Sequence, residues 1–231
     1  MNQPTLVLVH GALTDASVWR RVSRRLQEAG HPVIAPSLPM RDFGADVAYL
    51  KQFLRTLTGP LVVAAHSYAG CVISAPDALT PEVRSLVFVT AFQPEAGETA
   101  AALNGKFPGS GLVPDNLVVR AYPGGSEVYL REDKFGEVYA GDADERDRKV
   151  LAAAQKPFDP RTLEGSFAGD ASWHALPSWA VVSTKDNSIP TAAQRWMAER
   201  AGSKLVEVAS SHAVPLVHPD VVAETVVEAA S

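Results

Sequence analysis

Short apolar runs alternate with amphipathic segments along most of this chain. The runs are rich in valine, leucine and isoleucine, as in buried strands, and the segments between them carry apolar residues at helical spacing. Strands separated by helices form parallel sheets, because each crossover returns the chain to the same edge. The pattern predicts an α/β fold, with a mostly parallel sheet of about six strands and helices on both faces. The strands are expected at 6–9, 33–35, 61–64, 86–89, 179–182 and 204–208.

Capping residues and prolines mark where the predicted helices begin and end. Asp15 can cap a helix that ends near Gly30. Its apolar residues fall on one face: Val18, Trp19, Val22 and Leu26. Pro76 ends or kinks the helix after the third strand, and Pro190 can start the helix between the last two strands. Two further helices are expected at about 46–57 and about 219–229.

The alternation breaks between Gln93 and Pro177, where glycine and proline become frequent. We interpret 93–177 as a lid inserted above the sheet, with the α/β core formed by 1–92 and 178–231. Aromatic and aliphatic residues give this lid an apolar surface that either packs on the core or lines a ligand cleft. Its charged run from Asp142 to Lys149 is typical of a solvated helix face.

Composition limits the classes of function that remain. The 231 residues, 46 % of them hydrophobic, are enough for one sizeable α/β domain. A net charge of −5 and the lack of a basic tract argue against a nucleic-acid partner. The arginines that do cluster fit the solvated face of one helix: Arg20, Arg21, Arg24 and Arg25. The single cysteine, Cys71, excludes an internal disulfide and fits a reducing compartment.

No targeting or membrane segment is expected. The first residues lack the basic and apolar stretches of a signal peptide, which together with the lone cysteine favours a cytoplasmic protein. The stretch 59–76 carries no charge, but a proline near each end and polar residues in its middle favour strand, turn and buried helix over a membrane span.

One serine stands where a buried strand turns sharply into a helix. Ser67 lies in the sequence AHSYA, between the apolar run at 61–64 and the helix that Pro76 ends. A turn this tight requires small residues, usually glycine, two positions before and after the serine. Ala65 and Ala69 add only a methyl group each and keep that pattern. The position is typical of a hydrolase nucleophile.

A nucleophilic serine needs a base, a group that orients the base and an oxyanion hole. These partners are expected in loops after the carboxyl ends of strands, where ligands bind in open α/β sheets. Asp186 follows the strand at 179–182, and His212 follows the strand at 204–208. The order Ser67, Asp186, His212 matches a hydrolase with a nucleophile elbow. The backbone N–H groups of Ala12 and Tyr68 are the expected oxyanion donors.

Each candidate also has a purely structural interpretation. Ser67 could serve a tight turn only, and Asp186 could be a helix cap, in which case Glu95 is the alternative acid. His66 is expected to hydrogen-bond within the turn, and three further histidines fit loop anchors or caps: His10, His174 and His218. The sequence has no His-x-x-x-His pair, cysteine pair or glycine-rich phosphate loop, so no metal and no cofactor is expected.

Several segments resemble the α/β-hydrolase superfamily, and within it the small esterases that include plant methyl-salicylate and methyl-jasmonate esterases and plant hydroxynitrile lyases. They are LVHGA at 8–12, LQEAGHPV at 26–33, AHSYAG at 65–70, KDNSIP at 185–190 with QRW at 194–196, and SHA at 211–213. The resemblance implies a cofactor-free Ser-His-Asp enzyme. Lyases of this branch carry a threonine where this chain has Gly11 and a lysine where it has Ala213, so the resemblance favours an esterase.

Together these observations predict a carboxylesterase-type serine hydrolase that cleaves a small or medium, apolar ester through an acyl-enzyme. The residues expected to bind the substrate are Gly11, Trp19, Phe107 and Tyr122, and the ring of Tyr68 is expected to narrow the acyl pocket. A lactonase, a C–C hydrolase, a hydroxynitrile-lyase reaction and a binding protein without turnover stay open on the same scaffold. The physiological substrate and the choice between monomer and homodimer also stay open.

Overall fold

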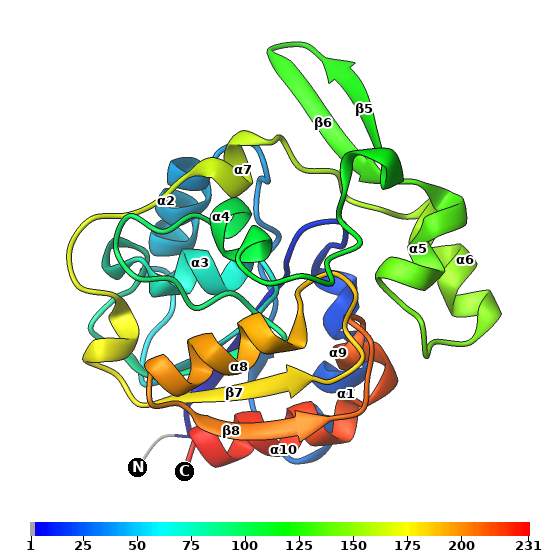
Figure 1. Ribbon diagram of the computed structural model, residues 1–231. Coiled ribbons are helices and arrows are strands. Elements are labelled where there is room, and N and C mark those ends of the chain that lie inside the picture. Colours follow the sequence, from blue (N-terminus) through cyan, green and yellow to red (C-terminus); the bar gives the residue numbers. More distant parts are fainter. Residues whose placement is uncertain (1–2) are drawn as a thin grey trace.

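The computed structural model describes residues 3–231 and contains a six-stranded sheet in the order β2-β1-β3-β4-β7-β8 (Figure 1). All neighbouring strands in this sheet are parallel. The strands are β1 (Thr5–Val9), β2 (Val33–Ile34), β3 (Leu61–His66), β4 (Val83–Val89), β7 (Ser178–Ser183) and β8 (Lys204–Val208). The predicted α/β fold with six strands is confirmed.

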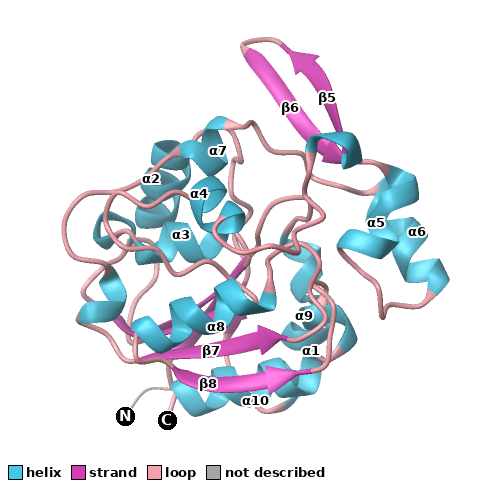
Figure 2. Cartoon of the chain, in the orientation of Figure 1, coloured by secondary structure: helices cyan, strands magenta, loops and turns pink. Residues whose placement is uncertain are grey.

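Helices cover both faces of the sheet (Figures 1 and 2). One face carries α1 (Arg20–Glu28) and α10 (Pro219–Ala229), which pack against each other, and the short α9 (Val214–Val217) lies beside them. The other face carries α2 (Phe43–Leu54), α3 (Ala69–Ser74) and α8 (Thr191–Arg200). Because both faces are covered, every residue of β3 is buried, which explains its uninterrupted apolar run.

The start of α2 differs from the prediction. The helix was expected from about Asp46, but it begins at Phe43 because Asp42 caps it and accepts a hydrogen bond from the Ala45 N–H at 3.1 Å. Asp46 therefore lies in the first turn and is fully buried. Two aspartates four residues apart are both acceptable caps, so the sequence alone does not distinguish them.

The first helix begins with a 3-10 turn, η1 (Ala16–Trp19), and Asp15 caps this turn as predicted, accepting a hydrogen bond from the Ser17 N–H. The predicted apolar face of η1 and α1 is buried. Two arginines at the start of α1, Arg20 and Arg21, pair with Asp147 at 3.3 and 2.8 Å. The arginine cluster thus contacts a second helix in addition to solvent.

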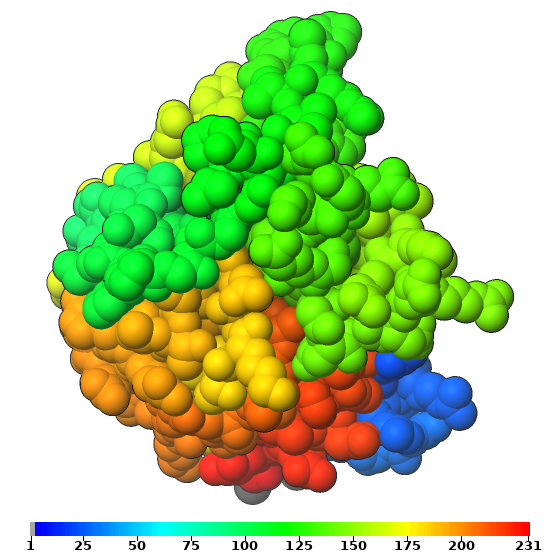
Figure 3. All heavy atoms as spheres, turned by 45° about the vertical axis from the view of Figure 1, so that its right-hand side comes forward, coloured from blue at the N-terminus to red at the C-terminus, as the bar shows by residue number. Residues whose placement is uncertain are grey.

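The segment between β4 and β7 has its own elements. They are α4 (Ala100–Gly105), η3 (Pro114–Asn116), β5 (Leu117–Tyr122), β6 (Gly125–Leu130), α5 (Glu132–Val138), α6 (Glu145–Ala153), α7 (Arg161–Glu164) and η4 (Ser172–His174). β5 and β6 form an antiparallel hairpin outside the main sheet, which sequence analysis did not predict (Figure 2). Figure 3 shows the hairpin at the top of the molecule, with α5 and α6 below it.

Two smaller expectations concern the buried interior. Cys71 is 2 % exposed within α3, as expected for a small filler, and its burial raises the pKa of the thiol. In the part of the chain that the structure describes, every helix is too short or too polar to cross a lipid bilayer.

Candidate active site

Ser67 occupies a strained turn between β3 and α3. Its φ is +56°, a left-handed conformation that costs a non-glycine residue energy and that is concentrated at functional sites. Near this turn, neighbouring atoms come so close to Gly11 and Gly70 that neither position has room for a side chain. A Cβ on Gly70 would lie 2.0 Å from the Phe92 carbonyl oxygen, and a Cβ on Gly11 would lie 2.6 Å from Ser67 Cβ. Gly11 and Gly70 therefore provide the space for the turn, whereas this chain has Ala65 and Ala69 where the usual elbow pattern has glycine.

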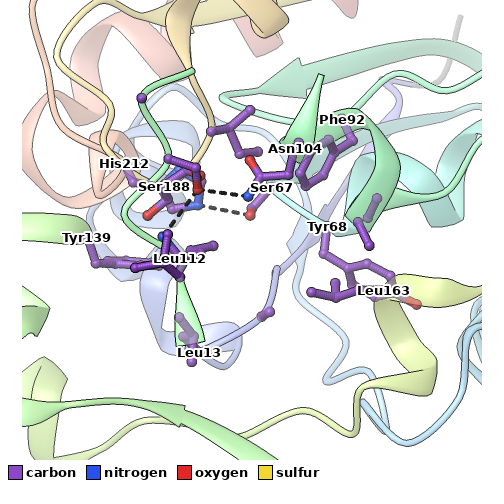
Figure 4. A pocket seen from close by; sticks show the side chains of 18 of the residues that line it. Leu13, Ser67, Tyr68, Phe92, Asn104, Leu112, Tyr139, Leu163, Ser188 and His212 are labelled. Atoms are coloured by element: carbon purple, nitrogen blue, oxygen red, sulfur yellow. Dashed lines mark hydrogen bonds between the residues drawn. The ribbon is translucent and has the colours of Figure 1, made fainter. Parts of the chain in front are cut away.

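Three side chains from distant parts of the chain form a hydrogen-bonded row. The Ser67 Oγ lies 2.9 Å from His212 Nε2 (Figure 4), and His212 Nδ1 lies 2.8 Å from Asp186 Oδ2. Ser67 follows β3, Asp186 follows β7 and His212 follows β8, so the carboxyl ends of three parallel strands bring them together. All three are buried, with His212 only 1 % exposed.

Asp186 also caps the turn that follows it, so both interpretations of this residue describe real contacts. Its Oδ1 accepts hydrogen bonds from the Ser188 N–H at 2.6 Å and the Ile189 N–H at 3.1 Å. Its Oδ2 accepts a second bond, from Gln194 Nε2 at 2.8 Å, in addition to that of His212. Sequence analysis did not assign Gln194, although it stands in the QRW segment that carries the family resemblance. These bonds fix the carboxylate plane against His212.

His66 was expected to hydrogen-bond within its own turn, but it contacts the loop of His212 instead. Its Nε2 lies 2.9 Å from the His212 carbonyl oxygen, to which it donates, and its ring lies 4.7 Å from the His212 ring. Burial, followed by the nearby His212, lowers the pKa of His66 well below its ordinary value, so this ring is neutral. The ring of Tyr139 also packs edge to face against His212, with the two ring centroids 4.8 Å apart.

The predicted oxyanion donors line the same pocket as Ser67. Within residues 3–231, the N–H groups of Ala12 and Tyr68 make no hydrogen bond to the protein. His10 anchors the first loop as predicted: its Nδ1 donates to the Gly11 carbonyl oxygen at 2.8 Å, and its Nε2 accepts from the Leu38 N–H at 3.0 Å. Burial lowers the pKa of His10 to about 4, which keeps that acceptor unprotonated at neutral pH.

The hydroxyl group of Tyr68 is held by a buried carboxylate, that of Asp46. Its hydroxyl donates to Asp46 Oδ2 at 2.9 Å, and Asp46 Oδ1 accepts from the Met40 N–H at 2.9 Å. The Tyr68 side chain is 1 % exposed, so most of its ring is packed into the core and only part of it borders the pocket. Burial raises the pKa of Asp46 to about 6.

Ser67 and His212 open into a cavity of about 430 Å³ (Figure 4). Among residues 3–231, no Asp, Glu, Lys or Arg lines it, and the polar side chains that do, besides Ser67, His212 and the aromatic hydroxyls, are Asn104, Ser110 and Ser188. The larger aliphatic residues and the phenylalanines that line it are Leu13, Phe92, Phe107, Leu112, Val113, Leu117, Phe158, Leu163 and Ile189. Most of these come from the segment between β4 and β7.

Three of the four residues predicted to bind substrate do not line the cavity. Phe107 lines the cavity, and Gly11 borders Ser67 closely enough to exclude a side chain. Trp19 does not line the cavity because the helix face that carries it points into the core, where it is fully buried 6.2 Å from His66. Tyr122 does not line it either, since it stands in the hairpin and donates to Asp159 at 2.9 Å.

The alternative acid, Glu95, is not part of the row, since it pairs with His174 at 3.1 Å on the surface. His218 stands 3.6 Å from Asp142, although its side chain does not cap α10. Among the residues described, no three His, Cys, Asp or Glu side chains gather as ligands for a metal ion.

Comparison with known proteins relates this geometry to one family. Residues 6–225 match the model described as "Alpha/beta hydrolase family". A carbendazim hydrolyzing esterase of Nocardioides sp. (strain SG-4G) is 32 % identical over 110 residues, so the match spans 42 % of this chain and less than half, 46 %, of that protein. Methylesterase 8 of Arabidopsis thaliana is 26 % identical over an alignment of 246 residues, covering 94 % of this chain and 85 % of that protein.

Solved structures share the fold over the whole chain. Polyneuridine aldehyde esterase superposes with a TM-score of 0.84 at 20 % identity, covering 100 % of both chains. A pyrethroid hydrolase from Sphingobium faniae JZ-2 gives a TM-score of 0.80 at 21 % identity, covering 98 % of this chain and 97 % of that one. At such low identity the likeness describes the architecture alone.

Proposed function

The chain belongs to the alpha/beta hydrolase family, and on that premise we propose that it is a carboxylesterase with Ser67 as nucleophile. His212 is the general base and acid, and Asp186 orients it. Relatives named as esterases and methylesterases support ester hydrolysis as the reaction class. The single observation that carries the proposal is the hydrogen-bonded row from Asp186 through His212 to Ser67 at an apolar cavity.

The reaction follows from the contacts of these three residues. His212 Nε2 takes the hydroxyl proton as the Ser67 Oγ attacks the ester carbonyl carbon, and Asp186 stabilises the imidazolium that forms. The N–H groups of Ala12 and Tyr68 then hold the carbonyl oxygen as it becomes an oxyanion. His212 passes its proton to the departing alcohol, which leaves the acyl group on Ser67. A water molecule repeats the sequence and releases the acid.

His212, and not the neighbouring His66, is suited to be the base. The Nε2 of His66 is engaged with a backbone carbonyl oxygen, and its low pKa prevents it from holding a proton at neutral pH. The Nε2 of His212 faces the Ser67 hydroxyl directly, and its Nδ1–H is held by a carboxylate. The imidazolium that forms in the reaction is therefore stabilised only at His212.

The cavity favours a neutral, largely apolar ester. An ionised substrate would lose its hydration without gaining a counter-charge, because no charged side chain of the described residues lines the cavity. A volume of about 430 Å³ lies within the range of roughly 300–1,000 Å³ typical of small-ligand sites. We further propose that 93–177 acts as the lid that decides substrate choice, since it provides much of the lining.

One observation bears on the lyase alternative. A Cβ on Gly11 would lie 2.6 Å from Ser67 Cβ and 2.8 Å from the His66 carbonyl oxygen. The threonine that hydroxynitrile lyases of the resembling branch carry at this position would not fit here without moving the nucleophile. This favours ester hydrolysis over cyanohydrin cleavage.

A panel of p-nitrophenyl esters of increasing acyl length, run beside a panel of lactones, tests the proposal. We expect hydrolysis of the esters, with kcat/KM rising until the acyl chain fills the cavity. Ser67→Ala should lower kcat on the order of a millionfold, to background. Turnover of lactones alone, absence of turnover, or full activity in Ser67→Ala would overturn it.

A further inference from the structure

One short segment between β4 and β7 contacts both loops that carry the acid and the base. It runs from Glu137 at the end of α5 to Asp142 before α6, and we call it the 137–142 segment. Its residues lie far in sequence from both loops, so these contacts fix one part of the fold against another. None of them involves the reacting atoms.

The first contacts are with the loop of Asp186. The Glu137 carbonyl oxygen accepts a hydrogen bond from Asn187 Nδ2 at 3.0 Å, and the Val138 carbonyl oxygen accepts one from Ser188 Oγ at 2.9 Å. Ser188 in turn donates its N–H to Asp186 at 2.6 Å. The 137–142 segment thus holds a residue that itself holds the acid.

The second contacts are with the residues on either side of His212. The Ala213 N–H donates to the Tyr139 carbonyl oxygen at 3.0 Å. On the other side, the Ser211 N–H donates to Asp142 Oδ2 at 3.0 Å, and the Ser211 hydroxyl donates to Asp142 Oδ1. Both neighbours of His212 are therefore tied to one segment. Asp142, the first residue of the predicted solvated helix face, is exposed, but it lies before α6 and its carboxylate contacts the loop of His212.

Asp142 is suited to hold this loop because both of its oxygens accept from one residue. Partial burial raises the pKa of this carboxyl, but hydrogen bonding, in which the bonds from Ser211 are the largest part, brings the pKa below its ordinary value, so the group is ionised at neutral pH. Besides Ser211, it has His218 at 3.6 Å. Asp142 does not line the cavity, so it has no part in holding the substrate.

We propose that Asp142 is a positioning residue for His212, an inference that rests on the proposed function. It fixes the backbone immediately before the histidine, while Tyr139 fixes the backbone after it and packs on its ring. The 137–142 segment is then part of the catalytic framework as well as of the lid. Removing it would stop the reaction and not merely broaden the choice of substrate.

Kinetics of three variants test this role. Asp142→Ala should lower kcat by about 10- to 100-fold, because a displacement of about 1 Å can cost 100-fold, and should change KM by less than about threefold. Asp142→Asn keeps one accepting oxygen and should recover part of the loss. Asp147→Asn is the matched control, since in the described part of the chain this carboxylate pairs only with Arg20 and Arg21, and it should keep the parent kcat.

Proton NMR of the hydrogen between His212 Nδ1 and Asp186 gives a readout that does not depend on turnover. In Asp142→Ala and in Ser211→Ala this downfield resonance should shift or broaden, and in Asp147→Asn it should stay. Combining Asp142→Ala with Ser211→Ala should add little to either loss, since both remove the same contact. If Asp142→Ala does not fold, Asp142→Asn and Ser211→Ala carry the same comparison.

The two proposals fail in different ways. An unchanged resonance together with the parent kcat in Asp142→Ala and Ser211→Ala would overturn the positioning role, as would a loss confined to KM. A resonance that responds in a protein without ester turnover would support the positioning of His212 while the proposed function fails.

Discussion

Asp46 allows the energetic effect of burial in this fold to be measured. Its side chain has no exposed surface, and its oxygens accept hydrogen bonds from the Tyr68 hydroxyl and the Met40 N–H. Burial raises the pKa of Asp46 from 3.8 to about 6 despite these bonds. At about 1.36 kcal/mol per pKa unit, this difference corresponds to about 3 kcal/mol.

The sign follows from which state holds the proton. The folded protein keeps Asp46 protonated up to about pH 6, whereas the unfolded chain ionises it near 3.8. Its contribution to stability is therefore complete below pH 3.8 and is lost as the pH rises through 6. Asp46→Asn stays neutral at every pH and can still accept from Met40 while it donates to Tyr68.

Urea unfolding of both proteins from pH 3 to pH 7 measures this effect. The free energy of unfolding of Asp46→Asn, minus that of the parent, should rise by about 3 kcal/mol over this range, with most of the rise between pH 4 and pH 7. Asp77→Asn, which removes an exposed carboxylate, is the control. Parallel curves for Asp46→Asn and the parent would refute the reasoning that burial sets this pKa.

Three further predictions follow from the close contacts and the buried histidine. Gly70→Ala should lower the unfolding free energy by about 1–3 kcal/mol, because its Cβ would meet the Phe92 carbonyl oxygen at 2.0 Å; an unchanged melting temperature would contradict this. Gly11→Ala should lower kcat about 100-fold by displacing Ser67; parent-like kinetics would contradict this and would mean that the loop of Gly11 moves while Ser67 stays in place. His10, whose pKa burial lowers from 6.5 to about 4, gives stability that is present above pH 6.5 and lost as the pH falls through 4. Relative to His10→Asn, the parent should lose about 3 kcal/mol between pH 7 and pH 3, and a constant difference would disprove it.

Local patterns were enough to predict the sheet and to nominate the three residues of the row. Buried parallel strands appear in the sequence as apolar runs. The residues that follow the carboxyl ends of such strands all lie at the same edge of the sheet. Ser67, Asp186 and His212 each follow such a run, so strand order alone places them at one edge.

Contacts between distant segments were not predictable in the same way. Most residues of β5 are exposed and β6 mixes exposed, partly buried and buried positions, so the hairpin has no continuous buried run like that of β3. Tyr122 was expected at the substrate because it is aromatic, but the hairpin directs it to Asp159. Gly70 must be a glycine because the Phe92 carbonyl oxygen lies against it. Sequence analysis did not single it out, because only the fold brings Phe92 to this position. Likewise, nothing in the sequence near Asp142 indicates that it meets Ser211.

Fluorophosphonate labelling decides whether Ser67 is a nucleophile activated by His212. Intact-protein mass spectrometry of the parent should show one phosphonyl group for each chain, and peptide mapping should place it on Ser67. In His212→Gln the labelling rate should fall by several orders of magnitude. An unlabelled Ser67, a label on another residue, or an equal rate in His212→Gln would contradict the assignment.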